Sequence, residues 1–329
     1  MTAPTLDTSA VAAFIEDATA APSMHNAQPW KFRFLRNSGI LRLYADLERE
    51  LPMTDPDGRN LHLSCGAALL NLRVAAVAAG REPATQLLPD ESDPTLLAEV
   101  DLTGTARSDN SLATLHPAIR RRHSSRFPFR EDDIPDVVAG ELRGAALLEG
   151  ARLVFPNDWH VRLVLDLVHD AEGRESQTPG VREETERWVR MEPTSETTAW
   201  DGIPAEAFGP AQWGAESPVR DFAAGRAVPG RGWAPFEKRP HIALLGTAQD
   251  RPADWLRAGQ ALERVWLLAT LDGLTASLTS QPLEWTELRW AVRDPTSAMG
   301  YVQMVMRLGY GPKGHPTPRR PVADVLDIV

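Results

Sequence analysis

The sequence predicts an α+β fold made of two related halves within one chain. Short alternating segments, typical of strands, are interleaved with long Ala/Leu-rich segments, typical of buried helices. Two of the helical segments, residues 66–80 and 259–273, both begin G-x-A-L and both end on Gly at the same offset. Either a half has been duplicated and fused into a pseudo-dimer, or two Ala/Leu-rich helices resemble one another by chance.

The first half, expected over 1–110, begins with a helix. Residues 9–19 carry apolar side chains at helical spacing after a Thr/Ser cap, and Pro22 ends the helix. Alternation around the turn residues Asn37-Ser38-Gly39 then predicts a hairpin. The elements expected after the first helix are strands at 30–34 and 40–46, a long buried helix at 60–80 and a strand at 99–103.

The second half, expected over 111–329, interrupts a similar pattern with an insert. Residues 174–235 are rich in Pro, Gly, Trp and charge, with one convincing helix near 182–191. A long segment of this kind is usually a functional lid or a mobile segment. The other elements expected are helices at 137–148, from about Val161 to Val168 and at 254–273, with strands at 151–155, 241–247 and within 301–311.

Composition bounds the class of protein. The 329 residues are 43% hydrophobic and carry 35 Lys+Arg against 45 Asp+Glu, a net charge of -10. This balance disfavours nonspecific binding to nucleic acid or to an anionic membrane. The sequence shows no signal pattern and no apolar run expected to span a bilayer. A single cysteine, Cys65, allows no internal disulfide and suits a cytoplasmic location, and its apolar neighbours favour a buried structural thiol over a nucleophile.

Two basic motifs are candidate anion sites. Residues 121–126, RRHSSR, combine guanidinium forks with hydroxyl donors. Residues 318–321, PRRP, hold two arginines between prolines that restrict the backbone. The alternative for each is an ordinary solvated basic segment.

Other signals of chemistry are weak. The G-x-G-x-x-G at 309–314 is followed by HPTPRRP, which cannot open a helix, so it is interpreted as a turn and not as a dinucleotide site. The histidines are scattered, and neither H-E-x-x-H, paired cysteines nor G-x-S-x-G occurs. No metal site is expected.

The stretch APSMHNAQPW, residues 21–30, concentrates special-purpose residues directly after a helix. It resembles the P-S-x-x-N-x-Q-P-W signature of the nitroreductase superfamily. RHSSR resembles the superfamily's R-H-S-x-K/R phosphate-binding start, PRRPV its C-terminal basic clamp, and LTSQPLEW (278–285) its P-x-E segment beside the flavin. The resemblance covers most of the chain and is weakest at 174–235.

The order of these motifs resembles the fused, Acg-like tandem members of that superfamily. The first half has P-S-x-x-N without R-H-S, and the second half has R-H-S and PRRP without P-S-x-x-N. The resemblance therefore implies a nitroreductase-like fold, with two half-domains that each hold an antiparallel-type sheet flanked by helices. It also implies a monomeric pseudo-dimer with parts for one complete FMN site, and further self-association is not excluded.

The resemblance also implies residue roles. Arg122, Ser124 and one or both of Arg319 and Arg320 would neutralise the FMN phosphate, and His123 would line the ribityl or phosphate end. Arg126 would lie near the pyrimidine edge. Glu284 would contact the N5 region through its backbone, although Trp285 stands where a small Gly is usual. The full set implied to bind the cofactor is Pro22, Ser23, Asn26, Arg122, His123, Ser124, Arg126, Pro282, Glu284, Arg319 and Arg320.

Three functions remain open at this stage. The first is an FMN-dependent oxidoreductase that uses NAD(P)H to reduce nitro, quinone or other conjugated acceptors; because flavin carries the chemistry, no catalytic side chain is expected. The second is an FMN storage or sequestering protein closed by the insert, with little or no turnover. The third is a biosynthetic FMN oxidase or desaturase.

Overall fold

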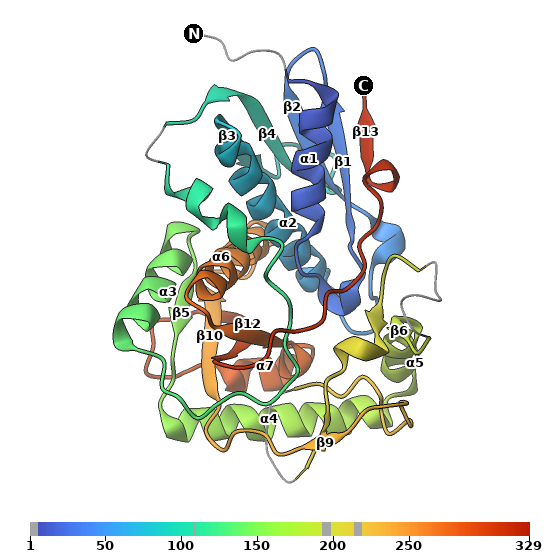
Figure 1. Cartoon of the computed structure of the whole chain (residues 1–329), viewed down its shortest axis with the longest axis vertical. Coiled ribbons are helices and arrows are strands. Elements are labelled where there is room, and N and C mark those ends of the chain that lie inside the picture. The colour runs from blue at the N-terminus through green and yellow to red at the C-terminus, as the bar shows by residue number, and fades with distance from the viewer. Residues whose placement is uncertain (1–5, 108–109, 193–198, 214–218) are drawn as a thin grey trace.

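The protein, described here from a computed structural model, contains two antiparallel-type sheets on either side of a central pair of helices (Figure 1). The structure describes residues 6–107, 110–192, 199–213 and 219–329. The first half contains α1 (Thr8–Thr19), η1 (Met24–Asn26), β1 (Trp30–Leu35), β2 (Ile40–Ala45), η2 (Leu47–Arg49), α2 (Arg59–Ala78), β3 (Arg81–Leu87) and β4 (Leu96–Thr105).

The second half follows the connecting η3 (Ser111–Ala118). It contains α3 (Asp136–Leu148), β5 (Arg152–Val154), α4 (Asp158–Gln177), α5 (Pro179–Arg187), β6 (Val189–Arg190), β7 (Ile203–Pro204), η4 (Ala205–Ala207), β8 (Ala211–Gln212), β9 (Trp233–Ala234), β10 (His241–Thr247), α6 (Pro252–Leu271), β11 (Thr275–Thr279), η5 (Gln281–Leu283), α7 (Thr286–Val292), β12 (Tyr301–Gly309), η6 (Val322–Asp324) and β13 (Leu326–Ile328). The mixture of helices and sheets confirms the α+β prediction.

The two sheets share one topology. The first has the order β13-β1-β2-β4-β3 and the second β11-β12-β10-β5. If β13 is set aside, β1, β2, β3 and β4 correspond to β5, β10, β11 and β12, and every corresponding neighbour pair is antiparallel. A helix precedes each first strand, and a 20-residue helix lies between the second and third strands of each set.

The two long helices of the repeat, α2 and α6, cross at corresponding glycines. A Cβ on Gly259 would lie 2.1 Å from the Leu63 carbonyl oxygen, and one on Gly66 would lie 2.3 Å from that of Leu256. Only residues without a Cβ allow the backbones to approach this closely. The repeat positions Gly80 and Gly273 end the two helices with the same φ of 79°. These equivalences favour duplication over chance.

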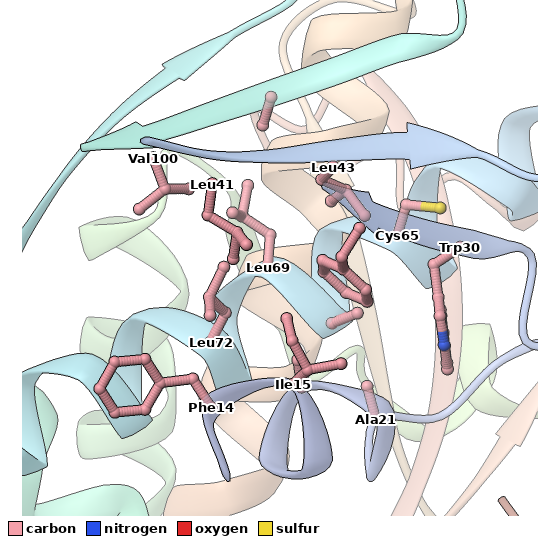
Figure 2. Close-up of a cluster of buried hydrophobic side chains, with 14 of the residues drawn as sticks. Phe14, Ile15, Ala21, Trp30, Leu41, Leu43, Cys65, Leu69, Leu72 and Val100 are labelled. Atoms are coloured by element: carbon pink, nitrogen blue, oxygen red, sulfur yellow. The ribbon is translucent and has the colours of Figure 1, made fainter. Parts of the chain in front are cut away.

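The core of the first half lies between α1, the first sheet and α2 (Figure 2). Alternation in β1 turns Trp30, Phe32 and Phe34 inward, each at most 1% exposed, because successive strand residues face opposite sides of the sheet. Cys65 lies in this core and its Sγ donates to the Pro29 carbonyl at 3.1 Å. Burial raises the pKa of the Cys65 thiol, in keeping with a structural role.

The tail after β12 runs back to the first half. Residues 310–321 pass over the seam, which is the boundary between the two halves (Figure 1). β13 then pairs in parallel with β1, with Phe32 opposite Leu326 (Figure 1). The first sheet is therefore completed by residues from the far end of the second half.

The structure corrects several sequence expectations. The N-cap of α1 is Asp7, whose carboxylate accepts from Ser9 N, and not a Thr or Ser. The long α4 extends to Gln177, so the irregular part of the insert begins later than residue 174, and residues 193–198 and 214–218 lie outside the described part. Strands β3, β11 and β13 and helix α7 were not expected.

One expectation about membranes also needs correction. Helix α2 is long and apolar enough to cross a bilayer by length and composition, with a mean hydropathy of 1.5 over its most apolar window. Within the fold, 83% of that window is buried against other elements. Buried core helices commonly pass the same test, so this property is weak support for a membrane span.

Candidate functional site

A cavity at the seam between the halves collects residues from all the main predicted motifs. The volume of the cavity is about 1050 Å³, including the solvent at its mouth. Eight of the residues predicted to bind the cofactor line it: Pro22, Ser23, Asn26, Arg122, His123, Ser124, Arg126 and Arg319. Among described residues the lining holds four arginines, counting Arg220 from the insert, and no aspartate or glutamate. The cavity therefore favours an anionic ligand.

The loop after α1 enters the cavity in a constrained conformation. His25, Asn26 and Gln28 have φ values of 52°, 56° and 55°, which non-glycine residues seldom adopt. The Ser23 hydroxyl accepts from Gln28 N at 2.9 Å, and Asn26 Nδ2 donates to the Pro318 carbonyl at 3.0 Å. Such strained positions persist where the surroundings fix them and are common at functional sites.

Arg319 fixes this loop to the end of α1. Its Nε donates to the Thr19 carbonyl at 2.8 Å, and its Nη2 reaches the Ala20 and Ala21 carbonyls, both at 3.1 Å. The Thr19 and Ala20 carbonyls belong to the C-terminal end of α1, where carbonyls lack intrahelical partners and favour a cation, and Ala21 follows directly after it. Its Nη1 donates to Asn26 Oδ1 at 3.0 Å. Arg319 therefore holds the loop in place as well as lining the cavity.

Arg122 lies beside Arg319 in the protein interior. Its guanidinium is 3.0 Å from Glu263 Oε1, donates from Nη2 to the Ala20 carbonyl at 2.7 Å, and stacks 4.4 Å from the Trp266 ring centroid. The contact with Glu263 is an ion pair without good hydrogen-bond angles, since Arg122 Nε has no hydrogen-bond partner. Burial, and after it the repulsion from the positive charge of Arg122, lowers the pKa of Arg319 to about 9.

Ser124 and His123 lie beside the tail that follows β12. Ser124 bridges Ala276 of β11, and the adjacent Ser125 Oγ donates to the Pro312 carbonyl at 2.7 Å. A Cβ at position 314 would lie 1.8 Å from the Ser124 carbonyl oxygen, so Gly314 is required for this approach. Burial, with Arg122 and Arg319 nearby, lowers the pKa of His123 to about 4.

Arg126 connects the R-H-S segment to the insert. Its Nη1 donates to the Ala207 carbonyl at 2.9 Å, and its guanidinium lies 4.8 Å from the Phe222 ring centroid. No carboxylate pairs with it among the described residues. Burial, with Arg220 nearby, lowers its pKa to about 10. This partly buried charge has free hydrogen-bonding capacity for an anionic or carbonyl-bearing ligand.

The insert covers part of the cavity and bonds to its loop. Asn26 Nδ2 donates to the Gly202 carbonyl at 2.9 Å, and Gln28 Nε2 to the Trp200 carbonyl at 2.7 Å. Ile203, Arg220 and Phe222 of the insert line the cavity. The insert is thus docked on the loop after α1, and its side chains form one wall of the site.

Three predicted residues lie outside the lining. Arg320 faces the first half, where its Nη1 is 3.2 Å from Asp46 Oδ2. Pro282 is buried in η5. Glu284 accepts from Ser280 Oγ at 2.8 Å and pairs with Arg220 at 3.3 Å, facing a neighbouring groove instead. Their placement follows from these partners and does not support direct cofactor contact.

Other lining residues were missed by the sequence interpretation. His25 lies inside the quoted motif, at a variable position. Arg220 and Phe222 lie in the insert, where no periodicity signals their direction, and Ser280 and Gln281 directly precede the predicted Pro282. Among the described residues, no group of three or more His, Cys, Asp or Glu side chains could hold a metal ion.

Comparison with known proteins gives full-length relatives. The chain is 33% identical to "Putative NAD(P)H nitroreductase Rv3131" of Mycobacterium tuberculosis strain H37Rv, over 94% of this chain and 89% of the relative. It is 31% identical to "Putative NAD(P)H nitroreductase acg" of the same strain, over 98% and 96%. No family model matches the chain.

Solved structures align less closely. A BluB-like flavoprotein from Clostridium difficile 630 covers 65% of this chain and 98% of its own, at 14% identity and a TM-score of 0.41. The FMN-dependent nitroreductase NfnB from Mycobacterium smegmatis, in complex with NADPH, covers 65% and 97%, at 15% identity and 0.38. Structural similarity at TM-scores this low gives no support to a family or a function for this chain. The full-length sequence relatives show that this chain belongs to the nitroreductase superfamily, as a member of its Acg-like group.

Proposed function

We propose that this protein is an FMN-dependent oxidoreductase that uses NAD(P)H to reduce nitro, quinone or other conjugated acceptors. The observation that carries the proposal is the cavity at the seam, whose described lining residues include four arginines and no carboxylate. The relatives' names as NAD(P)H nitroreductases point to the same reaction class.

The residues present fit a flavin nucleotide. A phosphate dianion would offset the mutual repulsion of Arg122 and Arg319, which have Glu263 as their nearby acid in the described part of the chain. Ser124 and Ser23 add neutral donors to the same lining. Arg126, with no acid partner among described residues, would stabilise negative charge on the ring system. Bound FMN would supply the hydride chemistry, while these residues bind and orient it.

Storage of FMN with little turnover is the second candidate. The insert supports it, because hydrogen bonds from Asn26, Gln28 and Arg126 hold the insert against the site. A wall held in this way would restrict the approach of nicotinamide and acceptor. We propose one FMN per chain in either case, in a pseudo-dimeric monomer of the cytoplasm.

An anaerobic visible spectrum, before and after NADPH, separates the candidates. A reductase is expected to be yellow at about one FMN per chain, to lose its flavin absorbance with NADPH and to regain it with 1,4-benzoquinone. Flavin that NADPH cannot reduce would favour storage. A colourless protein that takes up no FMN on titration would refute both.

The assignment of the site has its own test. Arg126→Ala and Ser124→Ala should each retain less FMN than the wild type, because each removes a donor from the lining. Arg130→Ala is the matched control, since that exposed side chain pairs with Asp132 outside the cavity. Unchanged flavin content in both lining variants would refute the assignment.

A further inference from the structure

His25 is a buried polar group in the cavity without an assigned role. Its side chain lines the cavity and is 4% exposed. Its Nε2 has no hydrogen-bond partner among the described residues. A buried nitrogen without a partner costs free energy, about 1–3 kcal/mol, so such groups in folded proteins call for an explanation.

The backbone holds His25 in place at a further cost. Its φ of 52° and ψ of 17° interrupt η1, and the neighbouring Asn26 is also left-handed. The conformation is fixed on both sides, because Arg319 binds Asn26 and the Ser23 hydroxyl binds Gln28 N. Strain maintained by specific contacts beside a cavity is typical of a residue that must point in one direction.

The surroundings of the imidazole keep it neutral. The Phe222 ring meets it edge-on, with centroids 5.8 Å apart, and Arg126 and Arg220 flank that same ring. Burial and these two cations lower the pKa of His25 well below 6.5. A neutral imidazole has one N–H donor and one acceptor nitrogen at physiological pH.

We propose that His25 contacts the acceptor and positions it by a hydrogen bond from its neutral imidazole to a nitro or quinone oxygen. This inference rests on the proposed oxidoreductase function and names the group that selects oxygen-bearing acceptors. The ring of Phe222 lies edge-on beside His25, so the insert forms the wall next to the proposed acceptor position. Arg126 and Arg220, which flank Phe222, would favour an acceptor that presents oxygen atoms with partial negative charge.

The test compares His25→Ala and His25→Gln with the wild type in the FMN-loaded protein. With 1,4-benzoquinone, His25→Ala should lower kcat/KM about tenfold, the effect of losing one hydrogen bond of about 1.4 kcal/mol. His25→Gln, which keeps a side-chain donor, should recover part of this loss. With ferricyanide, which takes one electron by outer-sphere transfer and needs no hydrogen bond from His25, both variants should match the wild type.

Further readouts separate a contact from a structural role. FMN per chain should stay near the wild-type value in both variants. The pH profile at and above neutral pH should keep its shape in His25→Gln, because burial and the two nearby cations hold the pKa of His25 well below 6.5. Both variants keep the other titratable and charged groups around the cavity. These are His123, His315, Arg126, Arg319, and Arg220 with its partners Glu175 and Glu284.

The outcomes distinguish this inference from the proposed function. A wild-type protein without FMN or without quinone turnover would refute the proposed function. A wild type that turns over, with His25→Ala equal to it for benzoquinone, would overturn the role of His25 alone. An equal loss for benzoquinone and ferricyanide, or loss of FMN, would also overturn it. His241→Ala is the matched control, because that imidazole contacts the Asp132 carbonyl away from the cavity.

Discussion

The two adjacent arginines of the tail, Arg319 and Arg320, should differ sharply in their effect on the site. Replacing Arg319 by Ala removes hydrogen bonds to three carbonyls at the end of α1 and to Asn26, at 2.8 to 3.1 Å. Arg320→Ala is the matched control. Its closest contacts to Gln28 O and Asp46 Oδ2 are both 3.2 Å, and Asp46 keeps Lys31 at 3.0 Å.

The magnitude follows from these contacts. The four hydrogen bonds from Arg319 to the first half, at about 1 kcal/mol each and less the hydration that the freed carbonyls regain, give about 2–3 kcal/mol for Arg319→Ala. Its other bonds, to Thr317 and Pro318, stay within the tail and add little. Arg320→Ala should cost about 1 kcal/mol, because its contacts are longer and its partner stays paired. For a chain of this size, about 2 °C of melting temperature corresponds to each kcal/mol. The expected shifts are therefore about 4–6 °C and about 2 °C.

Thermal melting of the FMN-free proteins measures these shifts, and equilibrium titration with FMN measures the consequence for the site. Arg319→Ala should weaken FMN binding at least tenfold, because it removes a lining cation and releases the Asn26 loop. Arg320→Ala should bind FMN as the wild type does. Equal losses of FMN affinity in the two variants would refute the reasoning that the structure separates their roles.

Three other changes test the interior of the protein. Glu263→Gln should destabilise the FMN-free protein by about 3–5 kcal/mol, since Arg122 loses its buried counterion. Added inorganic phosphate should raise the melting temperature of this variant more than that of the wild type. Equal increases in the two proteins would contradict the role of Glu263 as counterion. Gly259→Ala should prevent normal packing of α2 on α6, because its Cβ would lie 2.1 Å from the Leu63 carbonyl oxygen. The control Gly140→Ala, whose Cβ would have nothing within 4 Å, should fold normally. Two soluble and equally stable variants would count against the close crossing of α2 and α6. The folded-state pKa of His123, about 4, lies below its unfolded value, so the unfolded chain binds the proton first and stability falls as pH drops from about 6.5 to 4. Between pH 7 and pH 5, the free energy of unfolding of His123→Gln, measured with denaturant, should fall by about 1–2 kcal/mol less than that of the wild type. Equal falls in the two proteins would argue against the lowered pKa.

Much of the fold could be predicted because its signals are local. Alternation in WKFRF and ILRLYAD predicted the β1–β2 hairpin, and the Ala/Leu content of 60–80 predicted α2. β13 could not be predicted, since LDI is too short to show a period and its pairing with β1 is nonlocal. β11 and α7 are likewise short, and their structure depends on β12 and η5 beside them.

The site divides in the same way. Residues from motifs with a fixed local pattern, 22–26 and 122–126, line one cavity in the structure, and their binding of a cofactor stays a prediction. The choice between Arg319 and Arg320 could not be made from PRRP, because it depends on which side of the tail faces α1. Arg220 and Phe222 could not be found, since their position follows from how an irregular insert folds back onto the seam. The division of the chain at 110/111 and the cofactor roles stay predictions.

The pairing of β13 with β1 has a consequence for biosynthesis. As the nascent polypeptide leaves the ribosome, the β1 edge stays unpaired until nearly three hundred further residues have been translated, because its partner is Leu326–Ile328. Exposed strand edges recruit other chains, so this interval is when aggregation or chaperone binding would compete with folding. The same strand that closes the edge is joined to the segment carrying Arg319, so maturation of the first sheet and assembly of the cavity at the seam would be completed together.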